Sequence, residues 1–375
     1  MNLPEKDIHL LIDRLTASQR SFAIYRLPWT DEPVFVMQES EETEKLYDLP
    51  SLNGKTGFVI APFLPSEKHP AALIHADLKA CGWEAITRQL HALNITETAT
   101  DNLPAADEEV AIREENALKQ QYETAFNKFI APLQKGTFQK LVLSRQATQP
   151  LPADFSPLST FVTACNSYPR MMISLCHTPV TGTWIGSTPE IILSGHQDAW
   201  QTVALAGTMP MQGETMPTEW SRKNQEEQAF VSDYIRKIIK KFGSKPSEKG
   251  PYTARAGQLV HLKTDFHFTL KQTNQLGELL DALHPTPAVC GLPKAEAYEF
   301  ITQNEGYDRS YYSGIIGWLD PEGDTSLYVN LRCMKIGRSC TTLFAGGGIL
   351  PSSTAETEWE ETQHKMNTMR RILYL

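Results

Sequence analysis

The residue types best suited to chemistry gather near the end of the chain. A short apolar run that starts at Leu343 leads into three consecutive glycines, a Pro-Ser-Ser-Thr turn and an acidic stretch. Because glycine has no Cβ, its backbone can approach a ligand closely and direct N–H groups at an anion. The triplet Gly346, Gly347 and Gly348 is therefore a candidate cradle for an anionic ligand.

A helix that we expect to begin near Thr354 aligns the acids that follow the glycines. The i, i+3, i+4, i+7 spacing places Glu358, Glu361 and Lys365 on one face, which continues into apolar residues. Two carboxylates at the head of an inward-facing stripe suit a hard cation held by oxygen ligands. The alternative is a solvated acidic first turn, which favours any helix N-terminus.

Glu227 shows the same feature on a second helix, predicted over residues 219–242. It comes four residues before Val231, at the start of the apolar stripe. Burial of a carboxylate is costly unless the group is paired or bound to a metal. Glu227 is thus a further candidate ligand, with exposure of a frayed first turn as the alternative.

Lys140 is the first candidate for acid–base chemistry. It lies on a strand predicted over residues 138–147 and shares a face with Val142 and Ser144. A lysine on a strand usually lies on the solvated side of the sheet. If this face lines a pocket instead, burial lowers the lysine pKa and makes a neutral amine available as a base.

Two more strands carry side chains that suit an anionic ligand. His261 lies on the polar side of a long alternating strand and is a candidate orienting donor. Arg332 shares one face with Tyr328 and Asn330 on a strand predicted over residues 326–336. Its guanidinium is suited to a two-pronged contact with a carboxylate.

Composition narrows the classes of partner and compartment. The 375 residues carry a formal net charge of −9, which argues against nucleic acid or an anionic membrane as the main partner. No apolar run approaches the length of a membrane span, and no signal-peptide pattern is present. The six cysteines are scattered without a CxxC pair, as in proteins with reduced thiols. We therefore expect a cytoplasmic protein and, without a coiled coil or an obvious exposed apolar stripe, a monomer.

The periodicity predicts a large α+β domain built on antiparallel sheets. Strands of uneven spacing alternate with inserted helices, and no regular βαβ beat or internal repeat occurs. Helices are expected over 5–19, 109–133, 156–166, 219–242, 276–283 and 295–301, strands over 22–27, 34–38, 56–63, 138–147, 257–270, 313–319 and 326–336, and a surface loop over 92–108.

A series of motifs in one order resembles the chorismate-utilising enzymes, which include isochorismate synthase, anthranilate synthase component I, aminodeoxychorismate synthase component I and salicylate synthase. The motifs are KLVLSR (140–145), GSTPE (186–190), LAGT (205–208), KNQEEQ (223–228), HLKT (261–264), LHPTPAV (283–289), EGYDR (305–309), YSG (312–314), LR (331–332), FAGGGI (344–349) and EWEET (358–362) with Lys365. The resemblance covers residues 120–375 and is loose over residues 1–110. It implies a single domain over residues 1–375, with large antiparallel sheets packed as a sandwich and helices outside.

The resemblance also implies a reaction and the residues that perform it. In a reversible, Mg²⁺-dependent step, water adds at ring carbon 2 of chorismate as the 4-hydroxyl leaves. Lys140 matches the base that activates water and Glu190 the acid that protonates the departing hydroxyl, which requires a neutral lysine and a protonated glutamate. Glu227, Glu358 and Glu361 match the Mg²⁺ shell. The implied substrate-binding residues are Ala206, Gly207, Thr208, His261, Tyr312, Arg332, Gly346, Gly347, Gly348 and Lys365.

Ala206 bears on which member of the family the chain resembles most. Similar aminodeoxychorismate synthases often carry a lysine there that attacks the ring itself, whereas alanine leaves space for a small nucleophile. We expect an isochorismate synthase that feeds menaquinone synthesis. A siderophore branch, a salicylate or anthranilate synthase activity, and a non-catalytic binding protein are the alternatives. Asn224, Gln228 and Ser310 depart from the family pattern and put metal affinity in question.

Overall fold

The strands form two large antiparallel sheets. The computed structural model describes residues 6–18, 20–93, 112–211, 213 and 215–374. Each sheet has nine strands, and every pairing among the described strands is antiparallel. The first sheet has the order β14 (Gly291–Leu292), β7 (Lys140–Pro150), β18 (Cys340–Ile349), β17 (Cys333–Ile336), β9 (Gly182–Thr188), β8 (Met172–Thr178), β1 (Phe22–Arg26), β2 (Val34–Met37) and β6 (Leu78–Cys81). The second has the order β12 (Gly243–Ala256), β13 (Leu259–Leu270), β11 (Ala199–Pro210), β10 (Ile191–His196), β16 (Thr325–Val329), β15 (Ile315–Leu319), β4 (Gly57–Ala61), β5 (Ala71–Ile74) and β3 (Glu44–Leu46).

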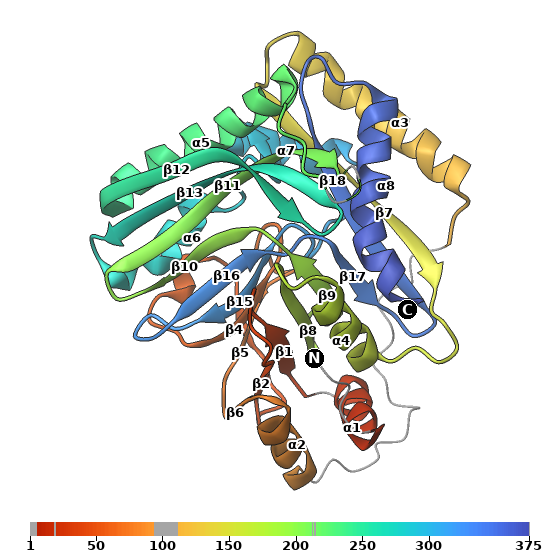
Figure 1. Ribbon diagram of the computed structural model, residues 1–375, viewed down its shortest axis with the longest axis vertical. Coiled ribbons are helices and arrows are strands. Elements are labelled where there is room, and N and C mark those ends of the chain that lie inside the picture. Colours follow the sequence, from red (N-terminus) through yellow and green to blue (C-terminus); the bar gives the residue numbers. More distant parts are fainter. Residues whose placement is uncertain (1–5, 19, 94–111, 212, 214, 375) are drawn as a thin grey trace.

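The helices lie on the outer faces of the two sheets (Figure 1). Helix α5 lies along β11 and β13 of the second sheet, whereas α8 packs on β18 and α3 on β7 of the first. The described α-helices are α1 (Lys6–Ala17), α2 (Trp83–Ala92), α3 (Glu115–Gln134), α4 (Pro157–Ser167), α5 (Arg222–Phe242), α6 (Leu276–Leu283), α7 (Lys294–Asn304) and α8 (Ala355–Ile372).

Alternation along single strands separates a core between the sheets from the two cores that include helix residues. In β1, Phe22 and Ile24 face the cluster that includes α1, α4 and α8, whereas Ala23 and Tyr25 face a middle cluster. That middle cluster contains side chains of both sheets, such as Trp184 of the first and Phe58 and Trp318 of the second. The predicted sandwich of antiparallel sheets with outer helices is therefore confirmed.

Helix α5 carries one of the predicted acids into the core. Val231, Ile235 and Ile239 are buried along one face, and each contributes about 1.5–3 kcal/mol through burial. Tyr234 and Ile238 are only half-buried beside this face. The helix begins at a serine whose side chain accepts a hydrogen bond from a first-turn N–H, so its first turn is capped rather than frayed.

The prediction of one continuous strand over residues 326–336 is wrong, because the chain passes from one sheet to the other within this range. Strand β16 belongs to the second sheet and β17 to the first, and Arg332 between them has a φ of 45°. The three side chains expected on one face consequently diverge. Tyr328 packs in the middle core, and the Asn330 amide donates a hydrogen bond to the Tyr311 carbonyl.

Periodicity also fails to predict β3, β5, β6, β12 and α2. The loop predicted over residues 92–108 lies, except for its first two residues, outside the described part of the chain. Within that described part, no helix combines the length and apolarity that crossing a bilayer requires.

Candidate active site

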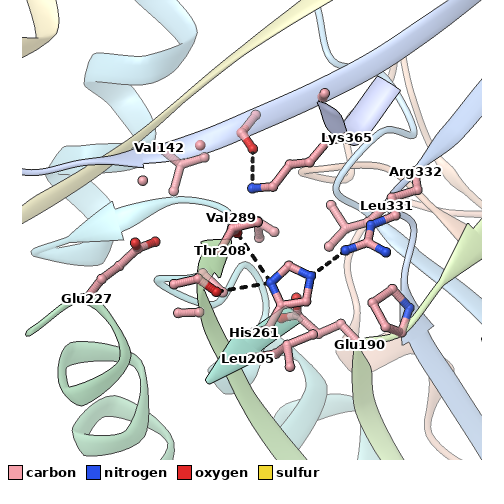
Figure 2. A pocket seen from close by; sticks show the side chains of 18 of the residues that line it. Val142, Glu190, Leu205, Thr208, Glu227, His261, Val289, Leu331, Arg332 and Lys365 are labelled. Carbon is pink, nitrogen blue, oxygen red and sulfur yellow. Dashed lines mark hydrogen bonds between the residues drawn. The ribbon is translucent and has the colours of Figure 1, made fainter. Parts of the chain in front are cut away.

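Strands of both sheets, with α5 and α8, bring most of the predicted site residues around one cavity (Figure 2). The cavity has a volume of about 60 Å³. Twelve of the predicted residues line it: Glu190, Ala206, Gly207, Thr208, Glu227, His261, Tyr312, Arg332, Gly346, Gly347, Gly348 and Lys365.

The remaining lining residues were not predicted as site residues. They form an apolar part of the wall made by Val142, Pro189, Leu205, Ala288, Val289, Leu331, Phe344 and Ala345. All of them fall within the motifs that carry the family resemblance. Their position inside those motifs was the signal that could have found them.

Glu190 lies in the turn between β9 and β10 and points into the cavity. Its backbone carbonyl accepts from Val329 N–H at 2.9 Å, which ties the turn to the end of β16. Burial raises the pKa of Glu190 to about 8, against the lowering effect of the nearby Lys140, Lys365 and Arg332 charges. At neutral pH this carboxyl therefore keeps its proton and can act as an acid.

Lys140 and Glu227 form a buried ion pair directly behind Gly348. Lys140 opens β7 and is 0% exposed, and its Nζ lies 3.0 Å from Glu227 Oε1 without the alignment of a hydrogen bond. Burial alone would raise the pKa of Glu227, but the ammonium groups of Lys140, Lys223 and Lys365 outweigh it and leave this pKa below its usual value. Glu227 lines the cavity, whereas Lys140 does not.

Glu358 and Glu361 lie on α8, one layer behind the cavity lining. Lys223 donates to Glu358 Oε1 at 2.5 Å, and Lys365 donates to Glu361 Oε1 at 2.7 Å. The other oxygen of Glu358 is buried without a partner. Burial, together with the charge of Glu361, raises the pKa of Glu358 to about 7.

The carboxylate oxygens of α8 fit a hard cation. A Cβ at Gly347 would lie 3.3 Å from Glu358 Oε2 and 3.4 Å from Glu361 Oε1, so both oxygens face one backbone position. An unpartnered buried oxygen beside a second carboxylate suits an oxygen-preferring divalent ion. Glu227 is turned toward Lys140 instead, and no three acidic, histidine or cysteine side chains in the described ranges converge on a single point.

His261 is held as a neutral donor and acceptor between Gly207 and Arg332 (Figure 2). Arginine can only donate, so Nε2 of His261 accepts from Arg332 and Nδ1 carries the proton. That proton is donated to the Gly207 carbonyl at 3.1 Å, with Thr208 Oγ1 3.3 Å away. Burial and the Arg332 charge lower the His261 pKa well below its usual value, which agrees with a neutral ring.

The predicted anion-binding cations are bonded to protein groups in this structure. Arg332 also donates to the Ala256 carbonyl at 2.9 Å, and Lys365 donates to the Gly346 carbonyl at 2.8 Å. Tyr312 stacks on Phe344 with ring centroids 5.4 Å apart. The cavity therefore carries positive charge, and both cations already donate hydrogen bonds to protein groups.

The residues that depart from the family pattern lie outside the cavity lining. Gln228 donates to Thr264 Oγ1 at 2.9 Å and accepts from Ser232 Oγ at 3.0 Å, which places its amide against β13. Ser310 has a φ of 45°. A glycine would take that backbone conformation without strain.

The comparisons with known proteins agree with this geometry. The family described as "Chorismate binding enzyme" matches residues 59–374. The match thus extends into the first third, where the sequence motifs gave only a loose resemblance.

Several curated relatives are similar over part of their length. The chain is 30% identical over 263 residues to the "Salicylate biosynthesis isochorismate synthase" of Pseudomonas aeruginosa, an alignment that covers 68% of this chain and 55% of that protein. It is 32% identical over 211 residues to "Isochorismate synthase EntC" of Escherichia coli K12, covering 53% of this chain and 54% of the relative. The chain thus spans about half the length of these two relatives.

A solved structure shows the same fold over nearly the whole chain. The menaquinone-specific isochorismate synthase MenF of Escherichia coli superposes with a TM-score of 0.76 at 21% identity, over 96% of this chain and 90% of that one. The family match, this fold and the cavity built from the family's motifs lead to one conclusion: the chain belongs to the chorismate binding enzyme family.

Proposed function

We propose that this protein is an isochorismate synthase that converts chorismate reversibly to isochorismate. The observation that carries the proposal is Glu190, a buried carboxyl whose pKa of about 8 keeps it protonated at the wall of a positively charged cavity. An acid of this kind is what loss of a ring hydroxyl requires. The names of the curated relatives support the same activity.

In the proposed reaction, water adds at ring carbon 2 while the 4-hydroxyl leaves. Lys140, an ammonium in its pair with Glu227 here, must first lose a proton to water. The neutral amine then takes a proton from the attacking water, and Glu190 gives its proton to the departing hydroxyl. Lys140 reaches the cavity only past Gly348, so its ion pair with Glu227 has to open during the reaction. Ala206 leaves room for water because its side chain ends at the cavity wall.

The substrate is a dianion, and the cavity supplies two cations for it. We propose that Arg332 and Lys365 bind its carboxylates in exchange for the carbonyl contacts that they make here. The cavity volume of about 60 Å³ is small for a ten-carbon acid, and we propose that these side chains move on binding. Neutral His261 then remains as a donor or acceptor toward the ring substituents.

We propose that Mg²⁺ is the cofactor and that Glu358 and Glu361 hold it, with Glu227 completing the set. The unpartnered Oε2 of Glu358 beside Glu361 supports this assignment. The ion would supply positive charge for a substrate carboxylate.

The route that uses the product is a separate proposal. We propose that isochorismate feeds menaquinone synthesis, with a siderophore or salicylate branch as the alternative. Deleting the gene in its host and measuring both products tests this: loss of menaquinone supports the proposal, and loss of a siderophore alone refutes it.

Replacing the proposed base and acid tests the mechanism. Lys140→Met and Glu190→Gln should each lower the kcat for isochorismate formation by at least about 10²-fold, as followed by chromatography. A kcat that neither replacement changes would remove these residues from the mechanism.

A further inference from the structure

A buried ion pair outside the predicted site residues lies behind the cavity wall. Arg309 and Glu305 follow α7 in the chain, and their side chains are 3% and 1% exposed. Arg309 Nε donates to Glu305 Oε2 at 2.6 Å, and Nη2 donates to Oε1 at 2.7 Å. Neither residue lines the cavity.

The remaining donors of Arg309 reach two strips of backbone that do line it. Nη1 donates to the Val289 carbonyl at 2.7 Å, and Nη2 donates to the Val142 carbonyl at 2.9 Å. Arg309 is also connected to a third part of the cavity wall through its backbone. The Tyr312 N–H donates a hydrogen bond to the Arg309 carbonyl at 2.9 Å. Val142, Val289 and Tyr312 all line the cavity.

Glu305 connects the ion pair to β7 at a second position, through hydrogen bonds with Ser144. Its Oε1 accepts from Ser144 N–H at 2.6 Å and from Ser144 Oγ at 2.8 Å. Strand β7 is therefore held at Val142 and at Ser144, directly after Lys140. The side-chain hydroxyl of Ser144 also lies 2.5 Å from the Tyr307 hydroxyl, which closes the network.

Stability alone does not account for an ion pair at this place. Removing two charges from water costs several kcal/mol, and apolar residues of similar size often serve stability equally well. What apolar residues cannot do is fix the distance between two carbonyls. A planar guanidinium with several donors does this, and lysine does not reproduce it.

We infer that Arg309, oriented by Glu305, is a positioning residue of the active site. It fixes β7, and with it Lys140, relative to the opposite wall at Val289. The kinetic part of this inference rests on the proposed function, in which Lys140 acts as the base. Arg309 itself does not touch the substrate.

Arg309→Lys tests the inference, and Arg26→Lys is the matched control. Arg26 is 1% exposed and likewise donates to backbone carbonyls, those of Leu27, Cys165, Tyr168 and Pro169. None of these residues lines the cavity. Both variants lose a buried guanidinium, so both should lower the melting temperature.

Two measurements separate positioning from general destabilisation. In Arg309→Lys, backbone amides of residues 140–144 should exchange hydrogen at least about tenfold faster, because the β7 clamp is loosened. The kcat for isochorismate formation should fall at least about tenfold, with a smaller change in KM, because the base is misplaced. Arg26→Lys should keep the exchange of β7 and the kcat of the unmodified protein.

The outcomes are distinct. Unchanged exchange in β7, or a kcat equal to that of Arg26→Lys, would overturn the inference. If unmodified protein forms no isochorismate, the proposed function fails, and the exchange measurement alone decides whether the clamp exists. Should Arg309→Lys not fold, the double variant Glu305→Gln with Arg309→Met removes both charges while the introduced amide oxygen can still accept from Ser144, and the same exchange increase is expected.

Discussion

The protonation state of Glu190 predicts how the activity depends on pH. Because burial raises its pKa to about 8, the acid is loaded at neutral pH and is lost as the pH rises through that value. The kcat/KM should therefore fall about tenfold per pH unit above about pH 8. Glu190→Gln should lower kcat at neutral pH by at least about 10²-fold and remove this alkaline limb. A pH profile of both proteins, with exposed Glu322→Gln as the control, checks this. An alkaline limb that persists in Glu190→Gln would assign it to another group.

The proposed role of Glu361 predicts how its replacement changes the Mg²⁺ dependence of the activity. Losing one of the carboxylates proposed to hold Mg²⁺ lowers the negative charge around the ion, so Glu361→Gln should raise the Mg²⁺ concentration for half-maximal activity by about tenfold or more. Calorimetric titration of the protein with Mg²⁺ provides a readout that does not depend on turnover. The exposed neighbour Glu360→Gln is the control on the same helix. An unchanged Mg²⁺ dependence would remove Glu361 from the site.

The sequence predicted single residues best where a motif fixes the residue type. Glu190 and His261 could be assigned because family motifs name them. The role of Arg309 could not be predicted, because its partners besides the neighbouring Glu305 are backbone carbonyls of residues 142 and 289, far away in the chain. Backbone partners leave no trace in residue type.

The glycines of strand β18 leave space for the side chains packed against them, which predicts the effect of adding a methyl group at each position. An alanine at position 348 would put its Cβ 2.1 Å from Glu227 Oε1 and 2.9 Å from Lys140 Cε. At position 347 the nearest atom is Glu358 Oε2, at 3.3 Å. Gly348→Ala should therefore displace the Lys140 pair and lower kcat by about 10²-fold, whereas Gly347→Ala should have a smaller effect on kcat measured at saturating Mg²⁺. Steady-state kinetics of the two variants test this prediction, and their melting temperatures show whether both are folded. Equal losses of kcat would show that space behind position 348 is not the constraint.

At the scale of elements, periodicity identified helices and central strands and failed where the chain departs from simple alternation. Strand β12 was missed because its exposed residues include lysines and prolines that disfavour strands. The break between β16 and β17 was missed because alternation continues across residues 326–336 although the backbone turns at Arg332. That turn is what directs the guanidinium into the cavity.

The whole molecule should unfold as one unit. Strands β1, β2 and β6 extend the first sheet from β8, and β4, β5 and β3 extend the second from β15, so the strands between Phe22 and Cys81 share both sheets with the catalytic motifs. Melting them alone would expose the middle core. Thermal unfolding should show a single transition, with far-UV and near-UV circular dichroism coinciding. Two separated transitions would contradict a single domain.

The sequence motifs predicted the family from residues 120–375, and the family match begins at residue 59. The earlier strands were predicted within the same domain but carry none of the motifs, so their places in the two sheets could not be predicted. The monomeric state and the cytoplasmic location remain predictions.

Incubation of the purified protein with chorismate and Mg²⁺, without ammonia, tests the central claim most directly. With products resolved by chromatography, the account predicts isochorismate alongside residual chorismate, and no isochorismate once a chelator is added. An aromatic product with released pyruvate, or no conversion at all, would contradict it.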